Sequence, residues 1–165
     1  MCTHACQCAR MMAPSHLLQY DPSVDTNEIG RAIATYPRIA SAWVFGSVAR
    51  GDAGPQSDLD IAVLLRGSLD SADTRALYTL SAELERFSPS GRVDIVVLGP
   101  QGVVFRHRVL SEGVLVLDAD PELRLDFEER TIREYLDWKP THDIAMRSTF
   151  AGLRDRFAPR KVQSS

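Results

Sequence analysis

Apolar residues recur along this chain with two different spacings, and the spacing separates predicted helices from predicted strands. From about residue 24 to 37 they repeat at helical intervals, with Asp25 or Thr26 able to cap the helix and Pro37 able to end it. Short uninterrupted apolar runs predict buried strands. The predicted strands are residues 42–45, 59–65, 93–98 and 114–117, and further helices are predicted over residues 71–87 and 99–110.

The chain from about residue 120 onward has the pattern of C-terminal helices. Asp120 followed by Pro121 is typical of a helix start, and Pro140 is predicted to break the run before a second helix begins at Thr141. The second helix carries an apolar stripe, for which packing against the core is favoured over a cofactor site, and which a partner helix could share. The stripe consists of Met146, Phe150, Leu153 and Phe157. The order of elements predicts a small mixed-sheet α/β core, of the α+β kind, flanked by helices.

Length, composition and charge narrow the function classes. The 165 residues are 44% apolar, so a single domain with its own core is expected, over residues 24–158. The formal net charge of −3 argues against direct nucleic-acid binding. The sequence has neither a stretch of about 18 apolar residues nor the apolar segment of a secretion signal. We therefore expect a cytoplasmic protein without membrane association.

All three cysteines fall within the first eight residues, at Cys2, Cys6 and Cys8, with His4 among them. This cluster could bind zinc. Structural zinc sites, however, usually combine two well-separated ligand pairs, and here the second pair is missing. A disordered leader over residues 1–23 is the favoured interpretation.

Three aspartates and a glycine-serine pair are the candidate site. Gly46 and Ser47 follow the apolar run at 42–45, and after ten intervening residues Asp58 and Asp60 flank the start of the next predicted strand. Because side chains alternate along a strand, these two carboxylates share one face, about 7 Å apart at Cα. Asp94 lies within the apolar run at 93–98, where an unpaired buried carboxylate costs several kcal/mol and must neutralise, pair or bind a metal. Three converging carboxylates favour Mg²⁺, and the glycine turn, the Ser47 hydroxyl and free backbone N–H groups suit a triphosphate.

Each part of this pattern also has an ordinary structural explanation. Asp-x-Asp before a strand is common turn chemistry, and Gly-Ser after a strand is a common loop opening. Asp94 could likewise lie on a solvated edge strand. Their joint order, with a third acid inside a later apolar run, favours catalysis. The basic run at residues 106–108 favours a solvated helix face over contact with triphosphate or with a partner protein.

The spacing of Gly46-Ser47, Asp58-Leu59-Asp60 and the later Asp94 resembles the signature of the DNA-polymerase-β-like nucleotidyltransferases. The surrounding residues, 44–51 and 57–63, are most similar to the minimal members of that superfamily, the MntA-type antitoxins. The similarity covers roughly residues 26–118, and residues 135–140 of the tail also match.

The resemblance implies an enzyme that uses ATP and two Mg²⁺ ions to transfer AMP to a tyrosine of a partner, a HepT-type RNase toxin. It implies that Asp58 and Asp60 bind both ions, that Asp94 binds the ion nearest the nucleophile, and that Gly46 and Ser47 hold the triphosphate. The alternatives are an antitoxin that acts by binding alone and a small-molecule nucleotidyltransferase of the aminoglycoside-resistance type.

Overall fold

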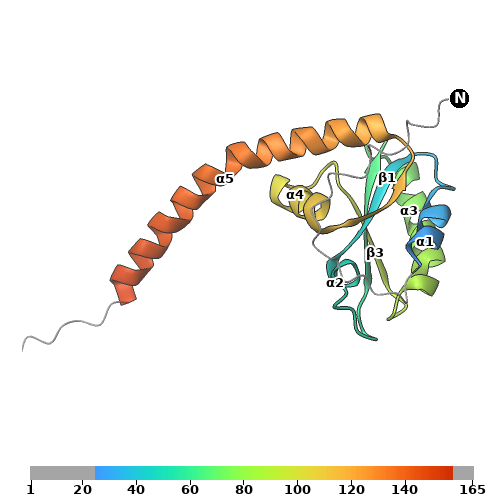
Figure 1. Cartoon of the computed structure of the whole chain (residues 1–165), viewed down its shortest axis with the longest axis horizontal. Helices are drawn as coiled ribbons and strands as arrows, with labels where there is room; N and C mark the ends of the chain where they lie inside the picture. The colour runs from blue at the N-terminus through green and yellow to red at the C-terminus, as the bar shows by residue number, and fades with distance from the viewer. Residues whose placement is uncertain (1–24, 158–165) are drawn as a thin grey trace, which may run out of the picture.

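A mixed four-stranded sheet forms the centre of the chain in a computed structural model that describes residues 25–157 (Figure 1). Its strands are β1 (Ile39–Phe45), β2 (Leu59–Leu65), β3 (Val93–Val97) and β4 (Val114–Asp118), in the spatial order β3-β2-β1-β4. β1 is antiparallel to both β2 and β4, whereas β2 and β3 are parallel. β3 and β4 are therefore the two edges of the sheet.

Helices cover both faces of the sheet, and each face has its own apolar core. Helices α1 (Thr26–Ile33) and α3 (Ser71–Leu84), the latter continued by the 3₁₀ turn η1 (Glu85–Phe87), pack on one face with Ile61 and Val63 of β2. Helix α4 (Val103–Glu112) and the start of α5 (Pro121–Phe157) pack on the other with Ala62 and Leu64. Consecutive β2 residues thus serve opposite faces, as the pleat requires. The short helix α2 (Gly46–Arg50) follows β1 directly.

The elements predicted between residues 24 and 118 are confirmed, with small shifts at their ends. The Asp25 carboxylate caps α1 by accepting hydrogen bonds from the N–H groups of Asn27 and Glu28. β2 occupies the predicted residues 59–65. The helix predicted over 99–110 begins later, at Val103, because the Gly99-Pro100 segment forms a turn. The α+β fold class is confirmed.

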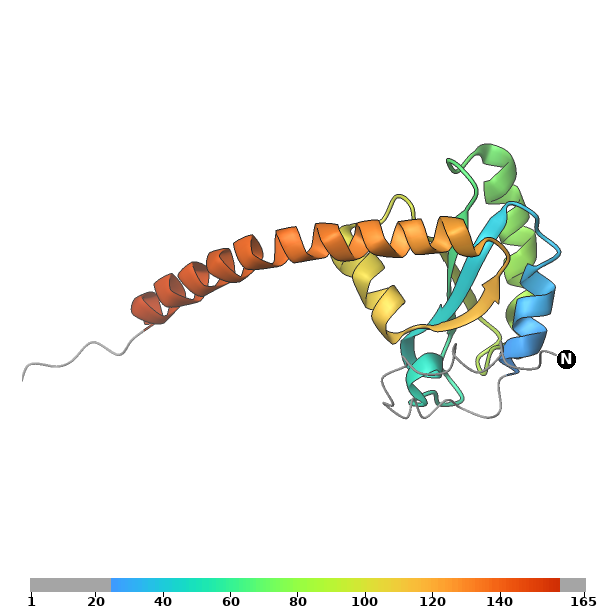
Figure 2. The ribbon, with the colours of Figure 1, turned by 45° about the horizontal axis from the view of Figure 1, so that its top comes forward.

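The predicted helix break at Pro140 is wrong. α5 continues through this proline to Phe157 as one helix that curves away from the sheet (Figures 1 and 2). A proline inside a helix removes one hydrogen bond and costs about 3 kcal/mol, but it can kink a helix without ending it when the flanking turns are long enough.

The predicted packing of the C-terminal stripe against the core is not found for Met146, whose side chain the structure describes. At 37 residues α5 is about 55 Å long, whereas a strand of the sheet spans only about 23 Å, so its second half lies beyond the sheet. Met146 is 39% exposed. The side chains of Phe150, Leu153 and Phe157 lie outside the described part of the chain.

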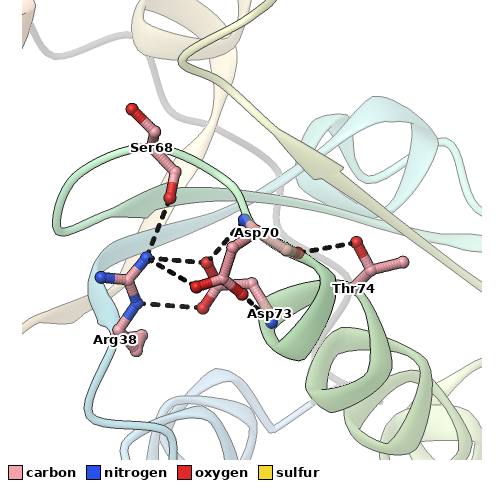
Figure 3. A network of polar contacts seen from close by, with 5 residues as sticks. All are labelled: Arg38, Ser68, Asp70, Asp73 and Thr74. Atoms are coloured by element: carbon pink, nitrogen blue, oxygen red, sulfur yellow. Dashed lines mark hydrogen bonds and ion pairs between the residues drawn. The ribbon is translucent and has the colours of Figure 1, made fainter.

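An ion-pair network joins the start of β1 to the start of α3 (Figure 3). The Arg38 guanidinium binds both carboxylate oxygens of Asp73, at 3.0 and 2.7 Å, and also donates to the Ser68 carbonyl. Asp73 and Asp70 form a reciprocal capping box at the start of α3. The hydrogen bonds from Arg38 are the main reason that the pKa of Asp73 lies below the ordinary value. This network is remote from the candidate site and holds the opposite end of the sheet.

The predicted leader over residues 1–23, with its cysteine cluster, lies outside the described residues. Within residues 25–157, none of the helices combines the length and apolar character that crossing a membrane would require.

Candidate functional site

The candidate residues meet where β1 ends and where β2 and β3 begin. Because β2 and β3 are parallel, both strands start at the same side of the sheet, and the antiparallel β1 ends there. Asp60 is the register partner of Asp94 on β3 and of Phe45 on β1. Side chains at paired positions of neighbouring strands project from the same face, about 5 Å apart. The sheet therefore places the carboxylates of Asp60 and Asp94 side by side, one residue from Gly46.

Asp60 and Asp94 project from the sheet face on which α4 and α5 pack, but they lie at the end of that face that these helices leave uncovered. Ala62, two residues after Asp60, is buried in that face's core with Leu98 and Trp43. At the other end of the same face Asp60 is only half-buried and Asp94 is exposed. The expectation that Asp94 is buried in an apolar strand is wrong, because β3 is an edge strand and its outer face is not covered at this point.

The charges of both other acids act on Asp60. Burial raises the pKa of Asp60 most, and the negative charges of Asp94 and then Asp58 raise it further, while the Arg50 charge opposes them. A carboxylate between two others at the same sheet end is a site of concentrated negative charge, which a cation relieves.

Asp58 has a different environment. Its Oδ1 accepts hydrogen bonds from Ser90 Oγ and from Arg92 Nε, both at 2.8 Å. The hydrogen bond from Ser90 and then that from Arg92 lower the pKa of Asp58. Sequence reasoning missed both partners, since the segment around Ser90 reads only as a turn.

In the part of the chain from residue 25 to 157, no three His, Cys, Asp or Glu side chains are already arranged around a metal position. Asp60 and Asp94 lie side by side on neighbouring strands, whereas the Asp58 carboxylate is turned toward Arg92. The Asp58–Arg92 ion pair is solvent-exposed, with side chains 43% and 70% exposed, so it adds little to stability and leaves the Asp58 carboxylate accessible to a cation. Carboxylate oxygens are the donors that Mg²⁺ prefers, and the residues present therefore fit this ion.

Gly46 is required by two independent features of the bend after β1. Its φ of +73° lies in the left-handed region. In addition, a Cβ at this position would lie 2.0 Å from Oδ2 of Asp60. The glycine therefore allows the backbone to run directly against the acid. Ser47 follows as the second residue of α2, whose start no described side chain caps.

Comparison with known proteins agrees with this geometry. The family described as "Polymerase beta, Nucleotidyltransferase" matches residues 27–122, which is more than half of the chain. No curated protein matches at a significant level.

Several solved structures share the fold. One is a crystal structure of a toxin-antitoxin with AMP-PNP. Its matching chain shares 24% sequence identity with this chain at a TM-score of 0.62, and the match covers 77% of this chain and 99% of that chain. A crystal structure of the toxin-antitoxin MntA-HepT is 22% identical with a TM-score of 0.56, over 76% and 96%. A structure of a tri-AMPylated Shewanella oneidensis HEPN toxin in complex with MNT antitoxin is 23% identical with a TM-score of 0.56, over 76% and 95%.

These structures confirm, at the level of the fold, the similarity to MntA-type proteins that the motif spacing indicated. The family match covers α1, all four strands and the acids Asp58, Asp60 and Asp94. The chain belongs to the polymerase beta family of nucleotidyltransferases.

Proposed function

We propose that this protein is an antitoxin that transfers AMP from ATP, with Mg²⁺, to a tyrosine of a HepT-type toxin in the cytoplasm and so neutralises the toxin. The similar solved structures support this proposal, because one contains AMP-PNP and another a tri-AMPylated toxin in complex with its antitoxin. ATP is the substrate and the toxin forms a hetero-oligomer with the chain.

The observation that carries the proposal is the register pairing of Asp60 with Asp94 directly beside Gly46. Nucleotidyl transfer needs concentrated negative charge for cations and an adjacent bend for phosphates, and this sheet end has both.

Each site residue has a role in the proposed reaction. The oxygen of the tyrosine hydroxyl attacks the α-phosphorus of ATP, a new P–O bond forms, and the bond to pyrophosphate breaks. Asp94, the exposed acid, lies where it can accept the hydroxyl proton. Gly46 and Ser47 hold the triphosphate. Magnesium held by Asp58, Asp60 and Asp94 would supply charge neutralisation and lower the pKa of the attacking hydroxyl.

The direct experiment incubates the full chain with labelled ATP, Mg²⁺ and a HepT-type toxin, and measures the mass of that toxin. We expect a gain of one or more AMP groups, which the Asp60→Asn variant reduces by about 10³-fold or more. Asp126→Asn is the matched control, because it makes the same chemical change at an exposed position of α5. Unmodified toxin after incubation with the wild-type chain would contradict the proposal.

An antitoxin that acts by binding alone is the second candidate. Large apolar side chains on the outer side of α5 favour it, since exposed apolar surface often marks a protein contact. They are Leu125, Ile132 and Leu136. If Asp60→Asn still protects cells from the toxin at wild-type expression, binding is sufficient. Label on a small alcohol and never on protein would instead support transfer to a small molecule.

A further inference from the structure

A groove runs along the free edge of β3, beside the candidate site. Its walls are β3 itself and the start of α3 with the loop before it, and Asp94 lies in its lining. Two large apolar side chains stand on the α3 side, Leu69 and Tyr78, which are 46% and 81% exposed. The groove thus reaches Asp94 of the candidate site.

The backbone of β3 offers unpaired hydrogen-bonding groups to this groove. The Arg92 carbonyl accepts from Leu59 N–H, and Leu98 N–H donates to the Val63 carbonyl, so the even-numbered residues of β3 face β2. Because the direction alternates, the N–H and C=O groups of Ile95 and Val97 point outward. Within residues 25–157, no strand pairs with β3 on that side.

We propose that this edge binds the acceptor segment of the protein substrate as an extended strand, which adds a fifth strand next to β3. Strand addition to an exposed edge is a common way to bind a peptide, since backbone hydrogen bonds give affinity and neighbouring pockets read alternate side chains. This inference rests on the proposed AMP transfer to a protein.

Register explains how such a strand delivers its hydroxyl group. A residue opposite Asp94 projects from the same face as Asp94, with the two Cβ atoms about 5 Å apart. Asp94 is itself the neighbour of Asp60, so three side chains stand in a row across three strands. An acceptor side chain at this position therefore reaches the acids, whereas one residue earlier or later it would point to the opposite face.

A substrate segment fits this edge better than a second copy of the chain. Two β3 strands paired antiparallel would bring a second Asp94 into the same short ladder, and charged side chains on an edge strand are one way in which proteins prevent edge-to-edge pairing. A peptide that brings a neutral hydroxyl group adds no charge.

Residue-resolved amide exchange tests this arrangement without relying on catalysis. In the free chain the outward N–H groups of Ile95 and Val97 should exchange fast, whereas those of Asp94 and Val96 are protected by β2. We expect a HepT-type toxin that the chain modifies, or a short peptide around the modified tyrosine, to slow exchange at Ile95 by at least tenfold. Slow exchange there in the free chain, with a dimer in solution, would overturn the proposal in favour of self-pairing.

Variants of the groove give a second measurement. Tyr78→Ala and Ile95→Pro should raise the KM for the protein substrate about tenfold while leaving the Kd for ATP unchanged, since one removes a groove wall and the other an outward N–H group. Leu115→Ser on β4, at the opposite edge of the sheet, is the matched control for losing exposed apolar surface. Tyr78 is exposed, so its replacement keeps the test valid if Ile95→Pro fails to fold.

The two proposals fail in distinguishable ways. If the wild-type chain modifies its partner while the Ile95 amide stays unprotected and Tyr78→Ala keeps the wild-type KM, strand addition is wrong and AMP transfer stands. If the wild-type chain transfers no AMP, the proposed function fails, and exchange at Ile95 with the partner still decides where the partner binds.

Discussion

Replacing Gly46 with alanine tests whether the bend after β1 must leave room for the Asp60 carboxylate. The added Cβ would lie 2.0 Å from Oδ2 and 3.0 Å from Cγ of Asp60, whereas ordinary contact begins at 3.4 Å. The Asp60 carboxylate therefore has to move by more than about 1 Å away from its position beside Asp94.

The substitution should have a small effect on stability and a large effect on the rate of AMP transfer. An alanine held at a φ of +73° costs about 1–2 kcal/mol of folding free energy, which lowers the Tm by about 2–8 °C. A displacement of about 1 Å at a catalytic group costs about 10²-fold in rate. We therefore expect Gly46→Ala to fold at 25 °C but to transfer AMP at about one hundredth of the wild-type rate or less.

Gly67→Ala is the matched control. Its φ of +88° imposes similar backbone strain, and its added Cβ would meet only Arg38 Nη1, at an ordinary 3.8 Å. Thermal unfolding and initial rates of AMP transfer are measured on both variants. The reasoning is refuted if the two variants unfold at similar temperatures and also transfer AMP at similar rates, because the contact with Asp60 would then have no consequence.

Three further predictions concern separate parts of the chain. Ser47→Ala should raise the Kd for ATP about tenfold by calorimetry, because it removes a hydroxyl donor to a charged phosphate. Asp73→Asn should lower the Tm at pH 7 and flatten its fall with acid below about pH 4. The lowered pKa of Asp73 means that the Arg38 pair stabilises the fold fully above the ordinary aspartate pKa and is lost as the pH falls through the lowered value. Pro140→Ala should slow amide exchange in the middle of α5, because it restores a helical hydrogen bond and raises the local stability by up to about 3 kcal/mol. Unchanged exchange would show that the helix is already open there.

The sequence predicts those features that depend on neighbouring residues. The apolar run of β2 and the capping by Asp25 follow from local pattern, and both were found at the expected positions. The spacing from Gly46 to Asp58 likewise indicates the site, because a strand, a bend and a second strand fix where these residues can lie.

Features that depend on distant residues were not predictable in this way. The partner of Asp58 is Arg92, 34 positions later, and nothing in the local sequence of either residue indicates the pair. Arg106 was expected on a solvated helix face, yet its side chain is only 13% exposed because it packs under α5 and pairs with Glu134. Pro140 was expected to end a helix, since local propensity does not measure the stability of the turns on either side.

The position of β3 at the edge of the sheet connects the failed expectation for Asp94 with the proposed mode of substrate binding. An apolar run such as 93–97 is compatible with a central or an edge strand, and only the strand order decides between them. In a central strand Asp94 would be buried and would need a permanent partner. At the edge, Asp94 is the register partner of Asp60 on β2, and its own side chain is exposed. It can therefore accept a proton from a group that arrives from solvent. An acid that must meet a protein substrate is therefore better placed on an edge strand than in the core, and the unpaired backbone of that strand gives the arriving segment its register.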